Sequence, residues 1–289
     1  MLRAVSTFIA LVVGAGISAD SAWAQDPSGR LKSIVANKII KIAHRTDATP
    51  FSFIADDKKE PKGYTIDFCK QIVASLGRQL GIQDLKVDWV PVTTQTRFEV
   101  VVKGEADLEC GSSTVTLGRM KLVDFSNYVF VESTGLVVRK AAGISDLKDI
   151  AGKKVAVIAG TSNENAVVLQ NRQLQLNAVV VPVKDRDEAI AALESGQVDA
   201  FASDKLLLVG TRFKDDQALR LLPNDLSIEP YAIALPRGDW ELRLAVNTAL
   251  AEIYRGGEAR KIYDRWFGQL GLQPGILLAA TYLLGALQE

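Results

Sequence analysis

Residues Val92–Arg119 read VTTQTRFEVVVKGEADLECGSSTVTLGR. The pattern predicts a polar loop, a short helix over about 97–103 that Gly104 ends, a strand over 106–109 and a second polar loop over 110–114. A further helix is expected to begin over 116–120. In an open α/β sheet, ligands bind beyond the carboxyl ends of strands, and helix N-termini offer free N–H groups to anions. The stretch therefore predicts a site for a small anion.

The first 24 residues differ in character from the rest of the chain. Arg3 precedes a small and apolar run over 7–17, and Ala22-Trp23-Ala24 follows as a small-x-small cleavage pattern. The run is short and is interrupted by glycine and by Asp20, which favours a secretory signal over a membrane anchor. We expect a signal peptide over 1–24 and an exported chain that begins near Gln25.

Length and charge limit the kinds of partner. The chain has 289 residues, 48% of them hydrophobic, which is enough for a substantial core and favours about two domains. Its formal net charge is +0, and removal of 1–24 takes away one arginine and one aspartate, which leaves that charge unchanged. A basic surface for nucleic acid is therefore not expected.

Two cysteines, Cys69 and Cys110, lie in the exported part. An even number of cysteines in an exported chain favours a disulfide, which would close a loop of roughly 40 residues and stabilise the fold by about 3–4 kcal/mol. Two buried free thiols are the alternative. The chain has one histidine, His44, and neither CxxC nor HxxxH spacing, so the sequence predicts no metal site and no cofactor.

Alternating strand and helix patterns occur twice. In the first series, a strand over 39–43 ends at His44-Arg45, a helix covers 66–80, and a strand over 86–90 leads to Thr93–Arg97. The second series contains strands over 155–158, 178–182 and 199–202, helices over 163–174 and 188–195, and an end at Ser203-Asp204. Such βαβ patterns favour parallel sheets covered by helices, and we interpret the two series as two similar α/β lobes.

Several motifs, in this order and spacing, carry a family resemblance. They are GYTID at 63–67, GEAD at 104–107, RMKLVDFS at 119–126, LKDIAGKKV at 147–155, ESGQVDA at 194–200 and IYDRWF at 262–267. The chain resembles the type II periplasmic substrate-binding proteins of ABC transporters, in the polar amino acid class. Through AHR at 43–45, TTQTR at 93–97 and ECGS at 109–112, it is most similar to glutamate/aspartate-binding proteins.

The resemblance implies an α/β fold of two lobes joined by two hinge strands, each lobe with a central sheet flanked by helices. Residues 25–136 with 232–289 would form one lobe, 137–231 the other, and the crossings would fall near 135–139 and 231–235. It also implies a monomeric, non-enzymatic periplasmic protein. Such a protein would capture L-glutamate or L-aspartate and deliver it to a membrane ABC transporter permease.

The resemblance also implies a role for each site residue. Arg119, Ser112, Thr114, Thr161 and Ser162 would bind the α-carboxylate, and Asp204 would bind the ammonium. Arg45, Arg97 and Thr94 would bind the side-chain carboxylate. Helix capping is a compatible role for Thr161, Ser162 and Asp204. Arg186 stands where the group often has histidine; it could strengthen acidic binding, reshape the pocket for another polar side chain, or point away.

Other functions stay open at this point. The ligand could be glutamine, asparagine or a broader set of polar amino acids. An enzyme on the same fold, such as a cyclohexadienyl dehydratase, would need an acid in the cleft, for which Glu164 and Glu109 are candidates. A receptor domain that feeds a separate sensor kinase is a third possibility. The region near the expected cleavage site contains no cysteine for a lipid anchor, which favours a free periplasmic protein.

Overall fold

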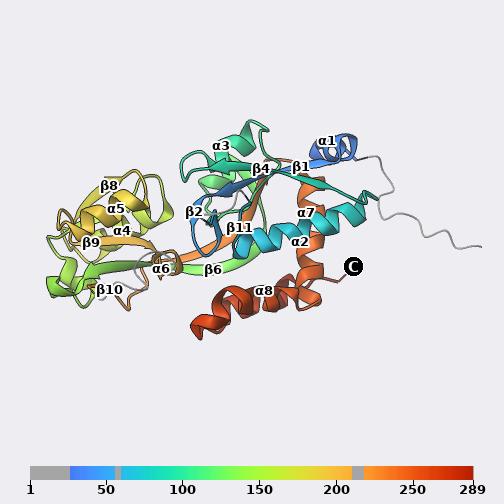
Figure 1. The fold of residues 1–289 in the computed structure, drawn as a ribbon. Coiled ribbons are helices and arrows are strands. Elements are labelled where there is room, and N and C mark those ends of the chain that lie inside the picture. Colours follow the sequence, from blue (N-terminus) through green and yellow to red (C-terminus); the bar gives the residue numbers. More distant parts are fainter. Residues whose placement is uncertain (1–26, 56–59, 210–217, 289) are drawn as a thin grey trace, which may run out of the picture.

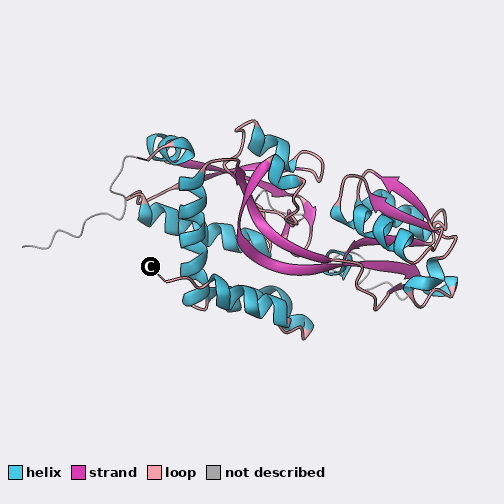
Figure 2. Ribbon diagram, turned by 180° about the vertical axis from the view of Figure 1, so that it is seen from behind, coloured by secondary structure: helices cyan, strands magenta, loops and turns pink. Residues whose placement is uncertain are grey.

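The computed structural model describes residues 27–55, 60–209 and 218–288, so the predicted signal peptide over 1–24 lies outside the described residues. Two α/β parts lie at opposite ends of the molecule, and two long strands run between them (Figures 1 and 2). These strands are β6 (Val123–Arg139) and β11 (Ile228–Pro236).

The first part contains the sheet that positions residues 92–119. Strands β4 (Lys86–Val92), β1 (Ile39–Arg45) and β5 (Leu108–Glu109) are parallel neighbours in that order, and β11 and β6 continue the sheet in antiparallel pairing. The predicted βαβ pattern is confirmed, although the sheet is mixed and not wholly parallel. Since β1, β4 and β5 point the same way, the loops that follow them meet at one edge.

Helices cover both faces of this sheet. One face packs on α2 (Tyr64–Gln79), α7 (Trp240–Arg255) and α8 (Glu258–Phe267) through an apolar core that includes Ile42, Phe68 and Ile233. Helix α3 (Arg97–Val102) contacts β1, β5 and β11 on a separate, smaller apolar cluster. The remaining elements of this part are α1 (Gly29–Asn37), α9 (Ile276–Gly285) and the short strands β2 (Asp47–Ala48) and β3 (Ser52–Phe53).

The second part repeats the arrangement on a smaller scale. Strands β9 (Ala200–Asp204), β7 (Lys154–Ile158) and β8 (Val179–Val183) are parallel, with β9 antiparallel to the end of β6. Its helices are α4 (Ser162–Gln173), α5 (Arg186–Glu194) and α6 (Lys205–Val209), and β10 (Leu219–Leu221) pairs with β6. The carboxyl ends of β7, β8 and β9 therefore form a second edge of loops.

Strand β6 differs from the sequence expectation. The patterns predict separate strands over 128–131 and 134–139, yet one strand of 17 residues runs through both. It pairs with β11 up to Ser133 and with β9 from Thr134, so it changes partner between these two residues. Glu132 and Ser133 lie between the two predicted strands, but Glu132 is buried and the backbone stays extended because each half of the strand has its own pairing partner.

The prediction of a helix that begins over 116–120 is wrong. The structure has a three-residue 3-10 turn, Arg119–Lys121, in its place. The Arg119 N–H donates to the Thr116 hydroxyl at 3.2 Å, and β6 begins at Val123, which leaves no length for a helix. The turn nevertheless holds Arg119 directly before the strand that joins the two parts.

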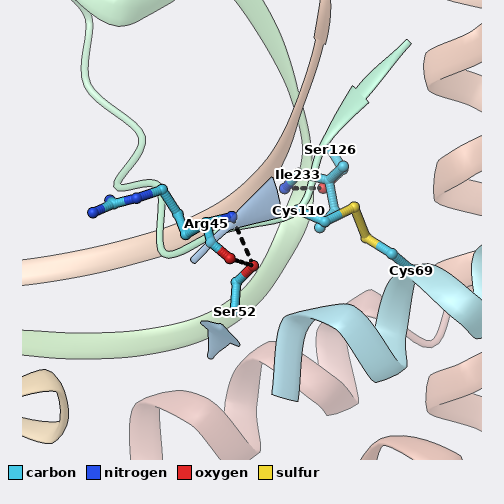
Figure 3. Close-up of a disulfide and its surroundings, with 6 residues drawn as sticks. All are labelled: Arg45, Ser52, Cys69, Cys110, Ser126 and Ile233. Atoms are coloured by element: carbon cyan, nitrogen blue, oxygen red, sulfur yellow. Dashed lines mark hydrogen bonds between the residues drawn. A yellow bond between two sulfur atoms is a disulfide. The ribbon is translucent and has the colours of Figure 1, made fainter. Parts of the chain in front are cut away.

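The predicted disulfide is confirmed: Cys69 of α2 is bonded to Cys110, directly after β5 (Figure 3). Both cysteines are fully buried. Figure 3 shows the side chain of Arg45 extending away from the disulfide, on the other side of the strand end. The disulfide therefore links the loop that begins at Cys110 to helix α2. The side chain of Arg45 extends in the opposite direction (Figure 3).

The apolar stretch near the end of the described chain forms α9, which packs on this part. Tyr282 stacks on Tyr254 with ring centroids 5.4 Å apart, and its hydroxyl meets the Tyr64 hydroxyl. Across the described ranges, no helix is both long enough and apolar enough to cross a membrane. Within the same ranges, no group of three or more His, Cys, Asp or Glu side chains could hold a metal ion.

We expect the double substitution Cys69→Ala with Cys110→Ala to lower the free energy of unfolding by about 4 kcal/mol, because it releases a cross-link between residues 41 apart. Urea denaturation of both proteins measures the difference. A change below about 1 kcal/mol would contradict a stabilising role for the disulfide.

Gly63→Ala should lower the free energy of unfolding by about 3 kcal/mol or more. Gly63 has φ +138°, and a Cβ there would lie 2.1 Å from the carbonyl oxygen of Phe51. Gly152→Ala is the matched control, because Gly152 also has positive φ (+68°) but no neighbour within 4 Å, which limits its cost to about 1 kcal/mol. Equal losses in the two variants would refute the steric explanation.

Candidate ligand-binding cleft

All ten binding residues predicted from the sequence line one cavity between the two parts. The first part contributes residues from the ends of β1, β4 and β5 and from the turn before β6: Arg45, Thr94, Arg97, Ser112, Thr114 and Arg119. The second part contributes residues from the ends of β7, β8 and β9: Thr161, Ser162, Arg186 and Asp204. The two edges of loops therefore face each other, as is typical of sites beyond the carboxyl ends of strands.

Two hydrogen bonds join the rims of the cavity. The Ser162 hydroxyl donates to the Thr114 hydroxyl at 3.3 Å, and the Gln95 side-chain amide donates to the carbonyl oxygen of Lys184 at 2.9 Å. Each bond connects a loop of the first part to a loop of the second. The structure therefore shows the two parts closed over the cavity.

The arginines of the cavity are largely removed from water. Arg45, Arg97 and Arg186 are 3%, 4% and 5% exposed. Arg45 forms an ion pair with Asp47 at 2.6 Å, and Arg119 donates to the carbonyl oxygen of Thr114 at 2.7 Å. Arg186 begins α5 and lines the cavity, so of the three alternatives for this residue, the structure excludes that it points away.

Phe98 supports two of these guanidinium groups. The guanidinium carbon of Arg97 lies 4.9 Å from the centroid of the Phe98 ring, and that of Arg119 lies 5.3 Å from the same centroid. An aromatic face attracts cations, so this ring stabilises two like charges next to each other. Phe98, which follows Arg97 in the sequence, thus supports two arginines that line the cavity without lining it itself.

Burial disfavours the charge on three of these arginines. It lowers the pKa values of Arg97, Arg119 and Arg186, and for Arg97, burial together with the nearby charge of Arg119 lowers the pKa to about 9. Several buried guanidinium nitrogens also have no hydrogen-bond partner among the described residues: Nε of Arg45, Nε of Arg97, and Nε and Nη1 of Arg186. Buried donors without partners are costly, so an anionic ligand that accepts from them would be strongly favoured.

Asp204 is the one carboxylate among the described residues that line the cavity. It is buried, and burial together with Glu229 raises its pKa. Its Oδ1 accepts from the Asn163 side-chain amide at 2.9 Å. The same amide donates to the Thr134 hydroxyl at 2.7 Å, and Thr134 donates to Glu229 at 3.2 Å. The acidic group of the cavity is thus connected to both β6 and β11.

The turn before α4 combines capping with lining of the cavity. Thr161 is the N-cap: its hydroxyl accepts from the Glu164 N–H at 3.2 Å and donates to the carbonyl oxygen of Ile158 at 2.7 Å. Glu164, a candidate acid in the enzyme hypothesis, accepts from the Gly160 N–H at 2.8 Å and is not among the lining residues. The other candidate, Glu109, lies beneath the cavity wall and is fully buried.

The sequence did not identify every lining residue. Ile158, Asn163, Ser203 and Leu207 also line the cavity. Asn163 and Ser203 lie next to predicted residues in the sequence, and this adjacency could have identified them as lining residues. Leu207 had no such signal, because its place depends on how α6 packs after β9.

Comparison with known proteins agrees with this geometry. Residues 40–269 match the family described as Bacterial extracellular solute-binding proteins, family 3. An L-glutamate/L-aspartate-binding protein of Pseudomonas aeruginosa is 34% identical over 93% of this chain and 89% of its own length. A glutamate/aspartate import solute-binding protein of Salmonella typhimurium is 33% identical over 87% of this chain and 85% of its own length. These relatives are binding proteins, in agreement with the prediction of a non-enzymatic chain.

A solved structure confirms the fold class. An ancestral arginine-binding protein bound to arginine superposes with a TM-score of 0.70 at 29% identity, over 80% of this chain and 98% of that chain. The predicted type II periplasmic binding protein fold, with its sheets flanked by helices, is therefore confirmed. On the family match and the identity over most of its length, the chain belongs to family 3 of the bacterial extracellular solute-binding proteins.

Proposed function

We propose that this protein captures an acidic amino acid, glutamate or aspartate, between its two lobes and delivers it to the permease of an ABC importer. The observation that carries the proposal is the charge of the cavity: four arginines, Arg45, Arg97, Arg119 and Arg186, line it together with a single carboxylate, Asp204, among the described residues. The ligands named for the two curated relatives support the same class.

Each group of an acidic amino acid has a matching partner in the cavity. Arg119, with the hydroxyls of Ser112 and Thr114, forms the subsite for the α-carboxylate, and Thr161 and Ser162 add donors at the start of α4. Asp204 is the subsite for the ammonium group. Arg45, Arg97, Arg186 and Thr94 then remain for the side-chain carboxylate.

Charge discriminates against other amino acids. A neutral side chain such as that of glutamine would bring no negative charge to the buried guanidinium groups of Arg97 and Arg186. A basic ligand, such as the arginine bound by the similar solved structure, would add a fifth cation to a desolvated site. The fold is shared with that protein, but the arginines of this cavity favour the opposite ligand charge.

Closure of the lobes is part of the proposal. Residues 25–136 with 232–289 would move as one lobe and 137–231 as the other, about the point where β6 exchanges β11 for β9. A ligand that contacts both lobes favours the closed form in proportion to its differential affinity. Cleavage of the predicted signal peptide would release a free monomer into the periplasm, where the permease could receive the closed form.

Isothermal titration with the twenty amino acids tests the ligand. We expect heat of binding for glutamate and aspartate, with glutamine and asparagine weaker by about 100-fold or more, because a site built for a charged partner rejects an analogue that lacks it. Comparable affinity for glutamine and glutamate would refute acidic specificity. Heat from neither acidic amino acid would refute the proposed function.

Arg97→Ala should weaken glutamate binding by at least about 30-fold, which corresponds to the loss of one partner of a buried charge pair. Removal of Arg97 relieves its repulsion with Arg119 but takes one compensating cation from the buried Glu109, so the melting temperature is measured beside the affinity to show that the variant is folded. Arg243→Ala is the control: this side chain is 44% exposed, lies outside the cavity and should leave affinity unchanged. Equal affinities of Arg97→Ala and the wild type would contradict the assignment.

A further inference from the structure

A second buried carboxyl lies directly beneath the cavity wall. Glu109 is the last residue of β5, in the interior of the first lobe's sheet, and its side chain is fully buried. It stands opposite Ala43 of β1 and Ala234 of β11, which are also fully buried. Residues directly opposite on neighbouring strands share a face, so Glu109 projects between two alanines.

The side chains around Glu109 on this face of the sheet are apolar. The face that Ala43 and Ala234 share carries an apolar cluster, which α3 helps to cover. The cluster consists of Ala43, Val92, Val101, Ala106, Val123, Phe125, Ala232 and Ala234. A charged carboxylate at such a place costs several kcal/mol unless other charges compensate it. The compensation must therefore come from the cavity side.

Three arginines provide that compensation. The charged groups that act on Glu109 are Arg97 of α3, Arg45 of β1 and Arg119 of the turn before β6. The Ser113 hydroxyl also lies beside the carboxyl and favours its charged form, but neither group makes a hydrogen bond of normal geometry. All three arginines line the cavity, so Glu109 and the ligand carboxylates share the same cations.

Gly111 allows this arrangement. A Cβ at Gly111 would lie 2.2 Å from Oε1 of Glu109 and 3.2 Å from Cγ of Arg45. The carboxyl of Glu109 therefore turns back beneath the loop that carries Ser112, toward the stem of Arg45. This position places it on the inner side of the cavity wall, opposite the side that a ligand would contact.

We propose that Glu109 is a positioning residue that serves as the resident counterion of these arginines and takes up a proton when an acidic amino acid binds. The inference rests on the proposed function. On binding, the ligand carboxylates accept the hydrogen bonds and charge of Arg97 and Arg119, and a proton from solvent joins one oxygen of Glu109. No covalent bond other than this O–H forms or breaks.

Local charge sets the direction of the effect. Of the three arginines that face Glu109, Arg45 is paired with Asp47, which leaves two positive charges that favour an ionised Glu109. Two ligand carboxylates would cancel them. Burial raises the pKa of Glu109, and the positive charge of Arg97 lowers it. When a ligand carboxylate neutralises Arg97, the pKa of Glu109 therefore rises further. Protonation then accompanies binding, and the contribution of Glu109 alone makes the affinity for glutamate increase as pH falls, by up to about tenfold per pH unit.

Other carboxyls act in the opposite direction. The ligand ammonium would lie near Asp204, which is itself close to Glu229 and Glu132, and burial raises the pKa of Glu132 to about 8. A positive charge there favours release of a proton. The net proton count of the wild type therefore combines uptake at Glu109 with release at this group, and a variant is needed to separate the two.

The test is titration of the full exported chain with L-glutamate at about pH 6 in two buffers of different ionisation enthalpy. The dependence of the heat on the buffer gives the number of protons taken up per ligand. We expect Glu109→Gln to bind glutamate with a proton number lower than that of the wild type, by up to one. Glu132→Gln is the matched control: another buried glutamate, away from the three arginines, whose loss should not lower the proton number.

Equal proton numbers in Glu109→Gln and the wild type would overturn this inference and leave the proposed function intact. The absence of heat for both acidic amino acids in the wild type would instead refute the proposed function. Should Glu109→Gln fail to fold or bind, infrared difference spectra of the wild type decide the matter. A new C=O stretch of a protonated carboxyl on addition of glutamate supports the inference, and its absence overturns it.

Discussion

Repulsion among four arginines in a cavity shielded from water is the constraint on which this structure depends. Like charges in a desolvated site repel, and burial removes most of the hydration of Arg45, Arg97 and Arg186. The fold compensates with Asp47 paired to Arg45, with the ring of Phe98 against Arg97 and Arg119, and with Glu109 behind the wall. Several guanidinium nitrogens still have no hydrogen-bond partner among the described residues, which favours an anion in the cavity.

The scaffold around the cavity keeps those charges in place. The three parallel strands of the first lobe end at one edge, and the disulfide fastens the loop after β5 to α2. The second lobe presents the start of α4, the start of α5 and the end of β9 to the same space. Because each charged side chain is attached at or next to the end of a regular element, its position depends on the sheets more than on loop conformation.

The hinge is chemically connected to the cavity. Asn163 donates to both Asp204 and Thr134, and Thr134 donates to Glu229 on the other crossing strand. The group proposed to bind the ligand ammonium therefore shares a hydrogen-bond network with the two strands about which the lobes would move. This network uses residues whose polarity would otherwise be costly in the interior, since Thr134 and Glu229 are 0% and 2% exposed.

The sequence by itself determined the α/β class and the strands that precede the loops, and its motifs, through the family resemblance, named ten candidate residues that the structure places in the cavity, with the direction of Arg186 left open. Hydrophobic periodicity and the glycines that follow periodic segments mark where helices and strands end. The carboxyl ends of parallel strands lie at the same edge of a sheet. Tertiary structure alone decided that β6 is a single strand, that 119–121 is only a turn, and that Arg186 lines the cavity. It also decided that Glu109 lies among arginines. Strand pairing and burial depend on residues far apart in the chain, so the local sequence pattern does not predict them.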